Sequence, residues 1–143
     1  MTTQTPRALI EAYVEALCQM HHDPEVKPFA MYHDDVTYTL PGLWPMGDTY
    51  RGLDDFMERL ATVAGPRMKG VEGGGMFAAE YICEGDKVVV IGRGRTRNAR
   101  DMPYNNCYFL WFEIRDGQIF NYLEDLDSSL AWQHAFDVHI EDA

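Results

Sequence analysis

The sequence holds 143 residues, 46% of them hydrophobic and 13% aromatic, which is the composition of a folded globular protein and excludes a disordered one. The 12 basic residues are outnumbered by 23 acidic ones, and a formal net charge of -11 argues against binding to nucleic acid or to an anionic membrane surface. This length predicts one domain over residues 1–143, with enough chain to bury a core without disulfides or structural metals.

Two features bear on cellular location. The first residues, MTTQTPRALIEAY, lack the basic segment and apolar stretch of a signal peptide, and no apolar run approaches the length of a membrane span. The cysteines Cys18, Cys83 and Cys107 are odd in number and lack metal-ligand spacing, so we expect them to be buried, free thiols. Together these features predict a cytoplasmic protein.

The first half of the chain predicts three helices and one strand. Thr5-Pro6 is typical of a helix start, and apolar residues then recur at helical spacing to about Met20. The segment PEVKPFAMYH (24–33) predicts a short second helix, and DVTYTLPG (35–42) predicts a strand ended by Pro-Gly. A third helix is expected in YRGLDDFMERLATVAG (50–65), after its turn glycine.

The second half predicts strands. The segment 75–84 ends in a tight Glu-Gly-Asp turn, 87–97 runs back, and 104–127 is expected to form two strands joined at Asp116-Gly117. Asp127 is then placed to cap a short helix in SSLAWQHAF. Helices followed by a strand meander predict an α+β fold, with helices on one face of a curved antiparallel sheet.

The fragments AYVEAL, YHDDVTYTLPG, TYRGLDDF, EGDKVVV and YNNCYFLWFEIRDGQIFNYLEDLD occur in an order that resembles the SnoaL-like branch of the nuclear transport factor 2-like, or ketosteroid isomerase-like, superfamily. The resemblance implies a cone-shaped barrel, in which the N-terminal helices pack on the concave face of the sheet and enclose a deep apolar pocket. It does not fix the function, because the fold hosts isomerases, aldol cyclases, dehydratases, epoxide hydrolases, lyases and binding modules.

Side-chain alternation assigns the faces of the aromatic strand. The resemblance makes one set the inner one, namely Tyr104, Asn106, Tyr108, Leu110, Phe112 and Ile114. Phe109 and Trp111 then lie on the outer face and need a cover, and the resemblance implies a homodimer formed through that face.

In GRGRTR (92–97), three arginines alternate with two glycines and a threonine. Either the arginines line an anion pocket, or they point outward and the glycines face in. Burying three guanidinium groups without partners costs several kcal/mol each. We therefore expect Gly92 and Gly94 to lie on the inner face, where they leave room for a ligand.

Two enzyme families of this fold have catalytic positions that can be located in this sequence. Tyr13 falls where similar ketosteroid isomerases carry an oxyanion-binding tyrosine, but Leu40 stands at the position of their general base. Tyr38 and Glu124 match two residues of limonene-type epoxide hydrolases, whereas Gly92 and Gly94 replace that family's Arg and Asp. Neither activity is therefore expected in its known form.

Glu124 is the candidate proton shuttle, because a carboxyl group half-buried among aromatic rings has a raised pKa. The alternative is that it pairs with an arginine. Four polar residues are expected to orient the substrate or stabilise an enolate: Tyr38, Asn106, Tyr108 and Tyr13. The alternative is that they form a cluster inside the core in which every polar group is hydrogen-bonded. The remaining candidates are expected to bind substrate, with the tryptophan as a lid or as part of a structural loop: Trp44, Leu40, Gly92, Gly94, Tyr122 and Phe112.

No cofactor is expected. The five histidines form no metal-ligand pattern, and EGGGMF leads into a strand instead of forming a phosphate-binding loop before a helix. The sequence thus predicts a cofactor-independent acid–base enzyme that acts on a small, hydrophobic, oxygenated molecule, aromatic or polycyclic. Cyclisation, isomerisation, dehydration and retro-aldol cleavage remain open, and the alternative is a non-catalytic binding or dimerisation module.

Overall fold

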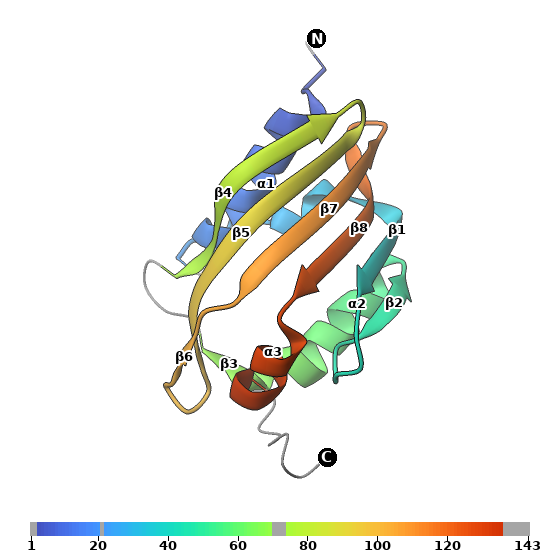
Figure 1. The fold of residues 1–143 in the computed structure, drawn as a ribbon. Helices are drawn as coiled ribbons and strands as arrows, with labels where there is room; N and C mark the ends of the chain where they lie inside the picture. The colour runs from blue at the N-terminus through green and yellow to red at the C-terminus, as the bar shows by residue number, and fades with distance from the viewer. Residues whose placement is uncertain (1–2, 21, 70–73, 136–143) are drawn as a thin grey trace.

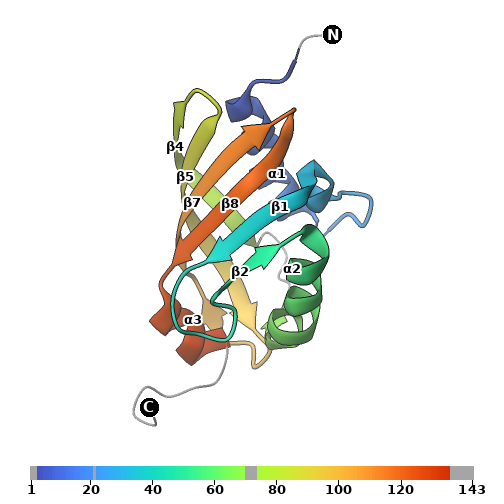
Figure 2. The same ribbon diagram turned by 90° about the vertical axis from the view of Figure 1, so that its right-hand side faces the viewer.

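The computed structural model describes residues 3–20, 22–69 and 74–135. A curved sheet wraps around helices that lie against one of its faces (Figures 1 and 2). The helical elements are α1 (Pro6–Gln19), η1 (Pro28–Met31), α2 (Leu53–Arg59), η2 (Leu60–Ala64), η3 (Gly65–Arg67) and α3 (Ser128–Ala135). The contacts of α1 are mainly with the β4 side of the sheet, and those of α2 are with β1 and β2 at the other side.

The sheet has eight strands among the described residues: β1 (Tyr32–Leu40), β2 (Asp48–Arg51), β3 (Met68–Lys69), β4 (Gly75–Glu84), β5 (Lys87–Asn98), β6 (Pro103–Tyr104), β7 (Cys107–Arg115) and β8 (Gln118–Leu126). Their order is β2-β1-β8-β7-β5-β3, with β4 and β6 also paired to β5. The cone of the nuclear transport factor 2-like fold is therefore confirmed.

The expectation of a purely antiparallel sheet was wrong, because β1 runs parallel to β8. Parallel neighbours need a long crossover connection. Here the chain between them contains α2 and the whole β4–β7 meander, so the first long strand meets the last one (Figure 2). The sheet is mixed and unclosed.

The predicted start and turn signals are confirmed. The Thr5 hydroxyl accepts a hydrogen bond from the Ala8 amide at 3.2 Å, and an Asp127 carboxylate oxygen accepts one from the Leu130 amide at 2.9 Å. Gly85 and Gly117 adopt φ values of 59° and 74° in the two tight turns, a backbone conformation that glycine adopts at little cost.

Two helix predictions need correction. Only Pro28–Met31 of the expected second helix forms, as a single 3-10 turn, and Tyr32 already belongs to β1. Two prolines in five residues remove backbone donors that a helix needs. The third helix ends at Arg59 and continues as a π turn.

Burial along β7 follows the predicted alternation. Asn106, Leu110 and Phe112 are at most 1% exposed, whereas Phe109 on the other face is 55% exposed. The expectation of buried thiols was wrong for two of the three cysteines: Cys107 is exposed on this outer face, and Cys83 is exposed near the turn that ends β4. In the part of the chain that the structure describes, no helix combines the length and apolar character needed to cross a bilayer.

Candidate active site

A cavity of about 270 Å³, called the main pocket here, lies between the concave face of the sheet and helices α1 and α2. The described residues of its walls are mostly apolar and aromatic, and one of them, Glu124, carries a carboxylate. Of the residues predicted for the site, the following line it: Tyr13, Tyr38, Leu40, Trp44, Tyr108, Tyr122 and Glu124. Asn106, Gly92, Gly94 and Phe112 do not line it.

Strand register brings the central polar groups together. The parallel pairing of β1 with β8 places Tyr38 beside Tyr122, and Glu124 follows two residues later on the same face of β8. On the other side of β8, Leu110 of β7 is the partner of Glu124. Residues distant in the sequence thus converge on one point of the pocket wall.

Two tyrosines hold one oxygen of the Glu124 carboxylate. The hydroxyls of Tyr38 and Tyr122 donate to its Oε2 atom at 2.6 and 3.0 Å. Glu124 makes no ion pair among the described residues, so the predicted alternative of a pair with an arginine is not observed there. No described residue donates a hydrogen bond to its other oxygen, Oε1, and Glu124 is among the residues that line the pocket.

Burial dominates the titration of this cluster. Loss of solvation raises the pKa of Glu124, and the hydrogen bonds from Tyr38 and Tyr122 offset part of that rise because they favour the charged carboxylate. Burial also raises the pKa of Tyr38 and of Tyr122 well above that of a free tyrosine, and the nearby Glu124 charge adds to this. The two phenols therefore stay protonated and act as donors.

Tyr13 lies at the end of the pocket formed by α1. Its hydroxyl hydrogen-bonds to that of Tyr32, and its ring meets the edges of Phe112 and Tyr122 with centroids 5.6 and 6.3 Å apart. Burial raises the pKa of Tyr13. Sequence reasoning missed Tyr32 because it assigned that residue to a helix. Extending the alternation of β1 back from Tyr38 through Val36 would have placed it on the inner face.

Asn106 lies behind the pocket wall and not on it. Its Nδ2 group donates to the Tyr104 hydroxyl and to the Asp127 carbonyl, both at 3.0 Å. Its Oδ1 accepts from the amides of Cys107 and Asp127 at 2.8 and 3.0 Å. This amide is saturated by the protein itself, and the group that it presents to the pocket is Tyr104, which sequence reasoning did not select.

Tyr104 and Tyr108 form a second polar pair in the wall. Burial is the largest cause of the raised pKa of both residues. A smaller contribution comes from the interaction between their hydroxyls, which offsets part of the rise for Tyr104 and adds to the rise for Tyr108. The Glu124 charge raises both pKa values further, so this pair lies within electrostatic reach of the carboxylate.

The other predicted binding residues occupy two layers. Leu40 and Trp44 line the pocket, and the indole N–H of Trp44 donates to the Pro41 carbonyl at 2.8 Å, which ties the ring to its own loop. Phe112 is fully buried behind the pocket, where it stacks on Tyr122 with centroids 4.6 Å apart. Phe56 of α2, which sequence reasoning placed only in a helix stripe, stacks on Tyr38 at 3.7 Å.

The glycines of β5 face inward, and Arg93 and Arg95 are exposed on the other face, which confirms the predicted orientation of GRGRTR. The space over the glycines is not empty, however. A Cβ atom at Gly92 would lie 2.5 Å from the Met76 sulfur, and one at Gly94 would lie 2.8 Å from the Tyr108 ring. The glycines therefore make room for two side chains of the chain itself.

No group of three or more His, Cys, Asp or Glu side chains in residues 3–20, 22–69 and 74–135 could hold a metal ion. The site as described offers proton transfer and hydrogen bonding. Its parts are a carboxylate held through one of its oxygens, tyrosine hydroxyls and an apolar wall.

Comparison with known families agrees with this geometry. The model of the SnoaL-like domain matches residues 10–122. The chain belongs to the SnoaL-like family. None of the curated proteins compared with it matches.

Solved structures share the fold of this SnoaL-like chain at low identity. A nuclear transport factor 2-like protein of Burkholderia thailandensis is 20% identical, with a TM-score of 0.73 over 90% of this chain and 95% of the other. A proposed isomerase of Rhodopseudomonas palustris is 13% identical, with a TM-score of 0.72 over 91% and 97%. TerC, co-crystallised with polyporic acid, is 24% identical, with a TM-score of 0.66 over 94% and 100%.

Proposed function

We propose that this SnoaL-like protein is a cofactor-independent enzyme that moves a proton next to a carbonyl or hydroxyl group of a small hydrophobic molecule. The observation that carries the proposal is Glu124, which lines an apolar pocket and whose Oε2 is held by two tyrosines, while no described residue donates a hydrogen bond to Oε1. Because burial raises its pKa, the carboxyl group can both accept and donate a proton closer to neutral pH than a solvated glutamate.

The proposed step is enolisation of a ketone. Oε1 of Glu124 takes a proton from the carbon next to the carbonyl, the C–H electrons form a carbon–carbon double bond, and the carbonyl oxygen becomes an enolate. Tyr108, Tyr104 and Tyr13 line the same pocket, and phenols of raised pKa are suited to donate hydrogen bonds to that oxygen without losing their protons. Where the ketone also carries a neighbouring carbon–carbon double bond, return of the proton from Glu124 to the far end of the dienolate gives isomerisation. Where it carries a β-hydroxyl, the enolate re-forms the ketone as the C–O bond breaks, and the hydroxyl leaves as water with the proton from Glu124.

The pocket walls support an aromatic or polycyclic oxygenated substrate. Tyr38, Phe56 and Tyr122 are among the aromatic residues that line the pocket, and such a wall suits a flat, largely apolar ring. TerC was crystallised with an organic acid, which supports the idea that this fold admits such molecules.

The test is hydrogen–deuterium exchange at the methyl group of 4-hydroxyacetophenone and related aryl ketones in D₂O, followed by proton NMR. Glu124→Gln is expected to slow catalysed exchange by about 10²–10⁴-fold, the range for a lost general base. Asp125→Asn is the matched control, because this exposed neighbour faces away from the pocket and should leave the rate unchanged.

Equal rates for the wild type and Glu124→Gln would remove Glu124 from the mechanism. The competing proposal is a binding module, which is favoured if aryl ketones bind in the pocket and no exchange above the solvent rate occurs. Because both outcomes are measured on the same ligands, binding by calorimetry and exchange by NMR separate the two functions.

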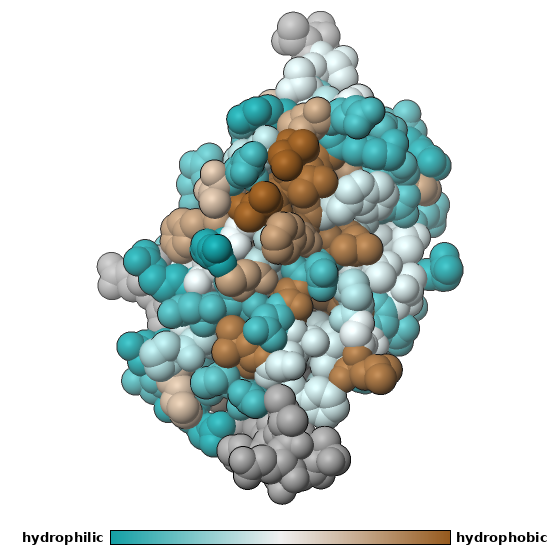
Figure 3. Space-filling model, in the orientation of Figure 1, coloured by the Kyte–Doolittle hydropathy of each residue, from teal (hydrophilic) through white to brown (hydrophobic). Residues whose placement is uncertain are grey.

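A second copy of the chain is proposed to cover the convex face. Ile82, Val89, Trp111 and Leu123 are register partners across four strands. Apolar groups gather at the centre of this face (Figure 3). Phe109→Arg should turn a dimer into a monomer in sedimentation velocity, and an unchanged mass would contradict this arrangement.

A cytoplasmic location stays a prediction.

A further inference from the structure

A second cavity, called the side cavity here, adjoins the main pocket. It has a volume of about 260 Å³, and both cavities are lined by Leu17, Met68, Met76 and Tyr108. Its other described lining residues come from the cap of α1 and from β3, β4 and β5, namely Met20, Lys69, Gly75, Gly94 and Thr96. Among the described residues these four side chains line both spaces, and they are called the partition below.

Three of the four partition residues are flexible, unbranched or aliphatic side chains that are only partly buried: Leu17, Met68 and Met76. Methionine adapts to irregular space because its side chain has three rotatable bonds and no branch. Met76 lies over Gly92, and Tyr108 lies over Gly94, so two of the four partition side chains occupy space that the glycines of β5 leave open. A partition of this kind can rearrange around a ligand without moving the backbone.

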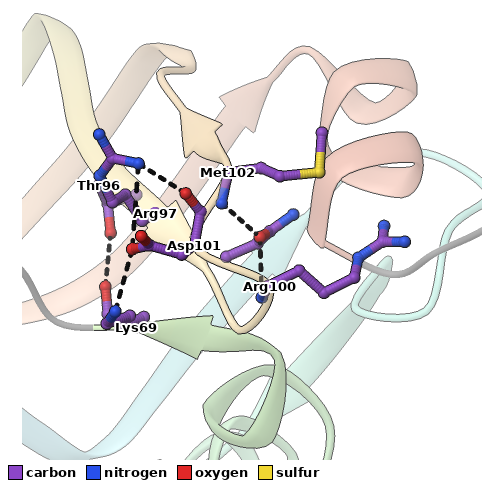
Figure 4. A network of polar contacts seen from close by, with 7 residues as sticks. Lys69, Thr96, Arg97, Arg100, Asp101 and Met102 are labelled. Carbon is purple, nitrogen blue, oxygen red and sulfur yellow. Dashed lines mark hydrogen bonds and ion pairs between the residues drawn. The ribbon is translucent and has the colours of Figure 1, made fainter.

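The far wall of the side cavity, in contrast, is fixed. Met68 and Lys69 pair with Asn98 and Arg97 of β5, and the Thr96 hydroxyl donates to the Lys69 carbonyl at 3.3 Å. Lys69 Nζ and Arg97 Nη1 both donate to Asp101, to its carboxylate at 2.9 Å and its carbonyl at 2.5 Å (Figure 4). Strand pairing and hydrogen bonds therefore hold the wall of the side cavity formed by β3 and β5. The side chains between this cavity and the main pocket are the adaptable part.

Volume and chemistry indicate what the combined space takes. Each cavity alone is below the range of about 300–1,000 Å³ that is usual for small-molecule sites, and together they reach it. Among the described residues that line the two cavities, the one carboxylate is that of Glu124 in the main pocket, and the side cavity is mostly apolar. A ligand that fills both has its oxygen function at one end only.

We propose that the main pocket and the side cavity form one elongated binding site for an oxygenated ring that carries an apolar extension, with Met68 and Met76 changing conformation to admit the extension. The ring with its hydroxyl or carbonyl lies against Glu124, and an alkyl chain or second ring passes the partition toward Thr96 and Met20. This inference rests on the proposed function, because it places the reacting end of the ligand at Glu124.

The test uses 4-alkylphenols from 4-methylphenol to 4-octylphenol, with Kd measured by isothermal titration calorimetry. The wild type should gain about fourfold in affinity for each added methylene that becomes buried, following about 0.8 kcal/mol per methylene. The gain should continue beyond the chain length that the main pocket accommodates.

Two variants fill the side cavity from opposite walls. Thr96→Phe on β5 and Met20→Trp at the end of α1 both change residues that line the side cavity alone. Each should bind 4-methylphenol as the wild type does, which also shows that the variant is folded, and should lose at least about tenfold in affinity for 4-octylphenol. Arg95→Phe places the same new side chain one residue away on the exposed face and should leave both affinities unchanged.

Each outcome decides between the two proposals. If 4-methylphenol binds and both filled variants keep full affinity for 4-octylphenol, the elongated site is wrong and the proposed function stands. If no phenol of the series binds to the wild type, the proposed small-molecule function fails, and the elongated site fails with it.

Discussion

The two faces of the sheet carry similar apolar content and have opposite roles. On the concave face of β7, Leu110 and Phe112 are at most 1% exposed, whereas Phe109 on the convex face is 55% exposed. Helices α1 and α2 account for this difference, because they pack against the concave face (Figure 1). The faces differ more in their polar groups: phenols and one carboxylate line the inside, and arginines with further carboxylates stand outside.

This contrast shows that polar groups mark the functional face better than apolar ones do. Apolar residues occur on both sides of β7, so hydrophobic alternation alone does not identify the pocket. A tyrosine hydroxyl is tolerated inside because it finds an acceptor, whereas a guanidinium group without a partner is not. Three experiments test the contrast, and they are given in order of decreasing effect.

The largest difference is expected between two phenylalanines of β7. Phe112→Ala should lower the free energy of unfolding by about 3–5 kcal/mol, because it leaves a cavity behind Tyr122. Phe109→Ala should change it by less than about 0.5 kcal/mol in dilute protein, where its ring is exposed. Guanidinium titrations at low concentration measure both, and equal losses would contradict the assignment of the faces.

An intermediate effect is expected at the inner polar cluster. Tyr38→Phe removes a donor to the Glu124 carboxylate and should cost about 1.5–3 kcal/mol when Glu124 is ionised. Tyr50→Phe, which removes a hydroxyl bonded to the neutral Met46 carbonyl, should cost about 1 kcal/mol and serves as the control.

The pH dependence gives the sign of this effect. The folded-state pKa of Glu124 is raised, so its neutral form is favoured in the native protein, and stability falls as pH rises from the unfolded-state pKa through the folded one. Because the Tyr38 bond favours the charged form, Tyr38→Phe raises the pKa of Glu124 further, and its cost should grow over the same pH interval. A cost for Tyr38→Phe that is the same at all pH values would show that the bond does not sense the Glu124 charge.

The smallest of the three effects is expected on β5. Gly94→Ala should cost about 1–3 kcal/mol, because the new methyl group meets the rigid Tyr108 ring. Arg95→Ala, one residue away on the exposed face, should stay within about 0.5 kcal/mol. Thermal unfolding of both variants tests whether β5 divides an inner from an outer environment, and an equal shift in Tm would argue that it does not.

Much of the architecture follows from local sequence signals. Thr5 and Asp127 cap helices, and turns that contain glycine join the strands. The alternation of side chains along β5 and β7 gives the inner face of each strand. The resemblance to a family supplied the cone, and with it the cluster of Tyr38 and Glu124. The parallel β1–β8 pairing was missed because no local signal specifies which strands meet across the chain.

The details of the site were less predictable for a related reason. Asn106 lies on the predicted inner face, yet its amide is consumed by Tyr104 and the backbone of Asp127, which only the fold brings within reach. The glycines of β5 were correctly turned inward, but what fills the space above them depends on Met76 from a neighbouring strand. Alternation gives the direction of a side chain and not its neighbours.

The parallel pairing of β1 with β8 also has a consequence for the kinetics of folding. Tyr38 and Glu124 are 86 residues apart in the sequence, so their contact closes a loop that spans most of the chain. Hairpins such as β7–β8 form from local contacts. Closing a loop of this length, in contrast, costs conformational entropy before the contacts between β1 and β8 can stabilise it. We expect the carboxylate cluster to assemble last, after the meander is in place, so that recovery of the active site lags behind recovery of strand content during refolding.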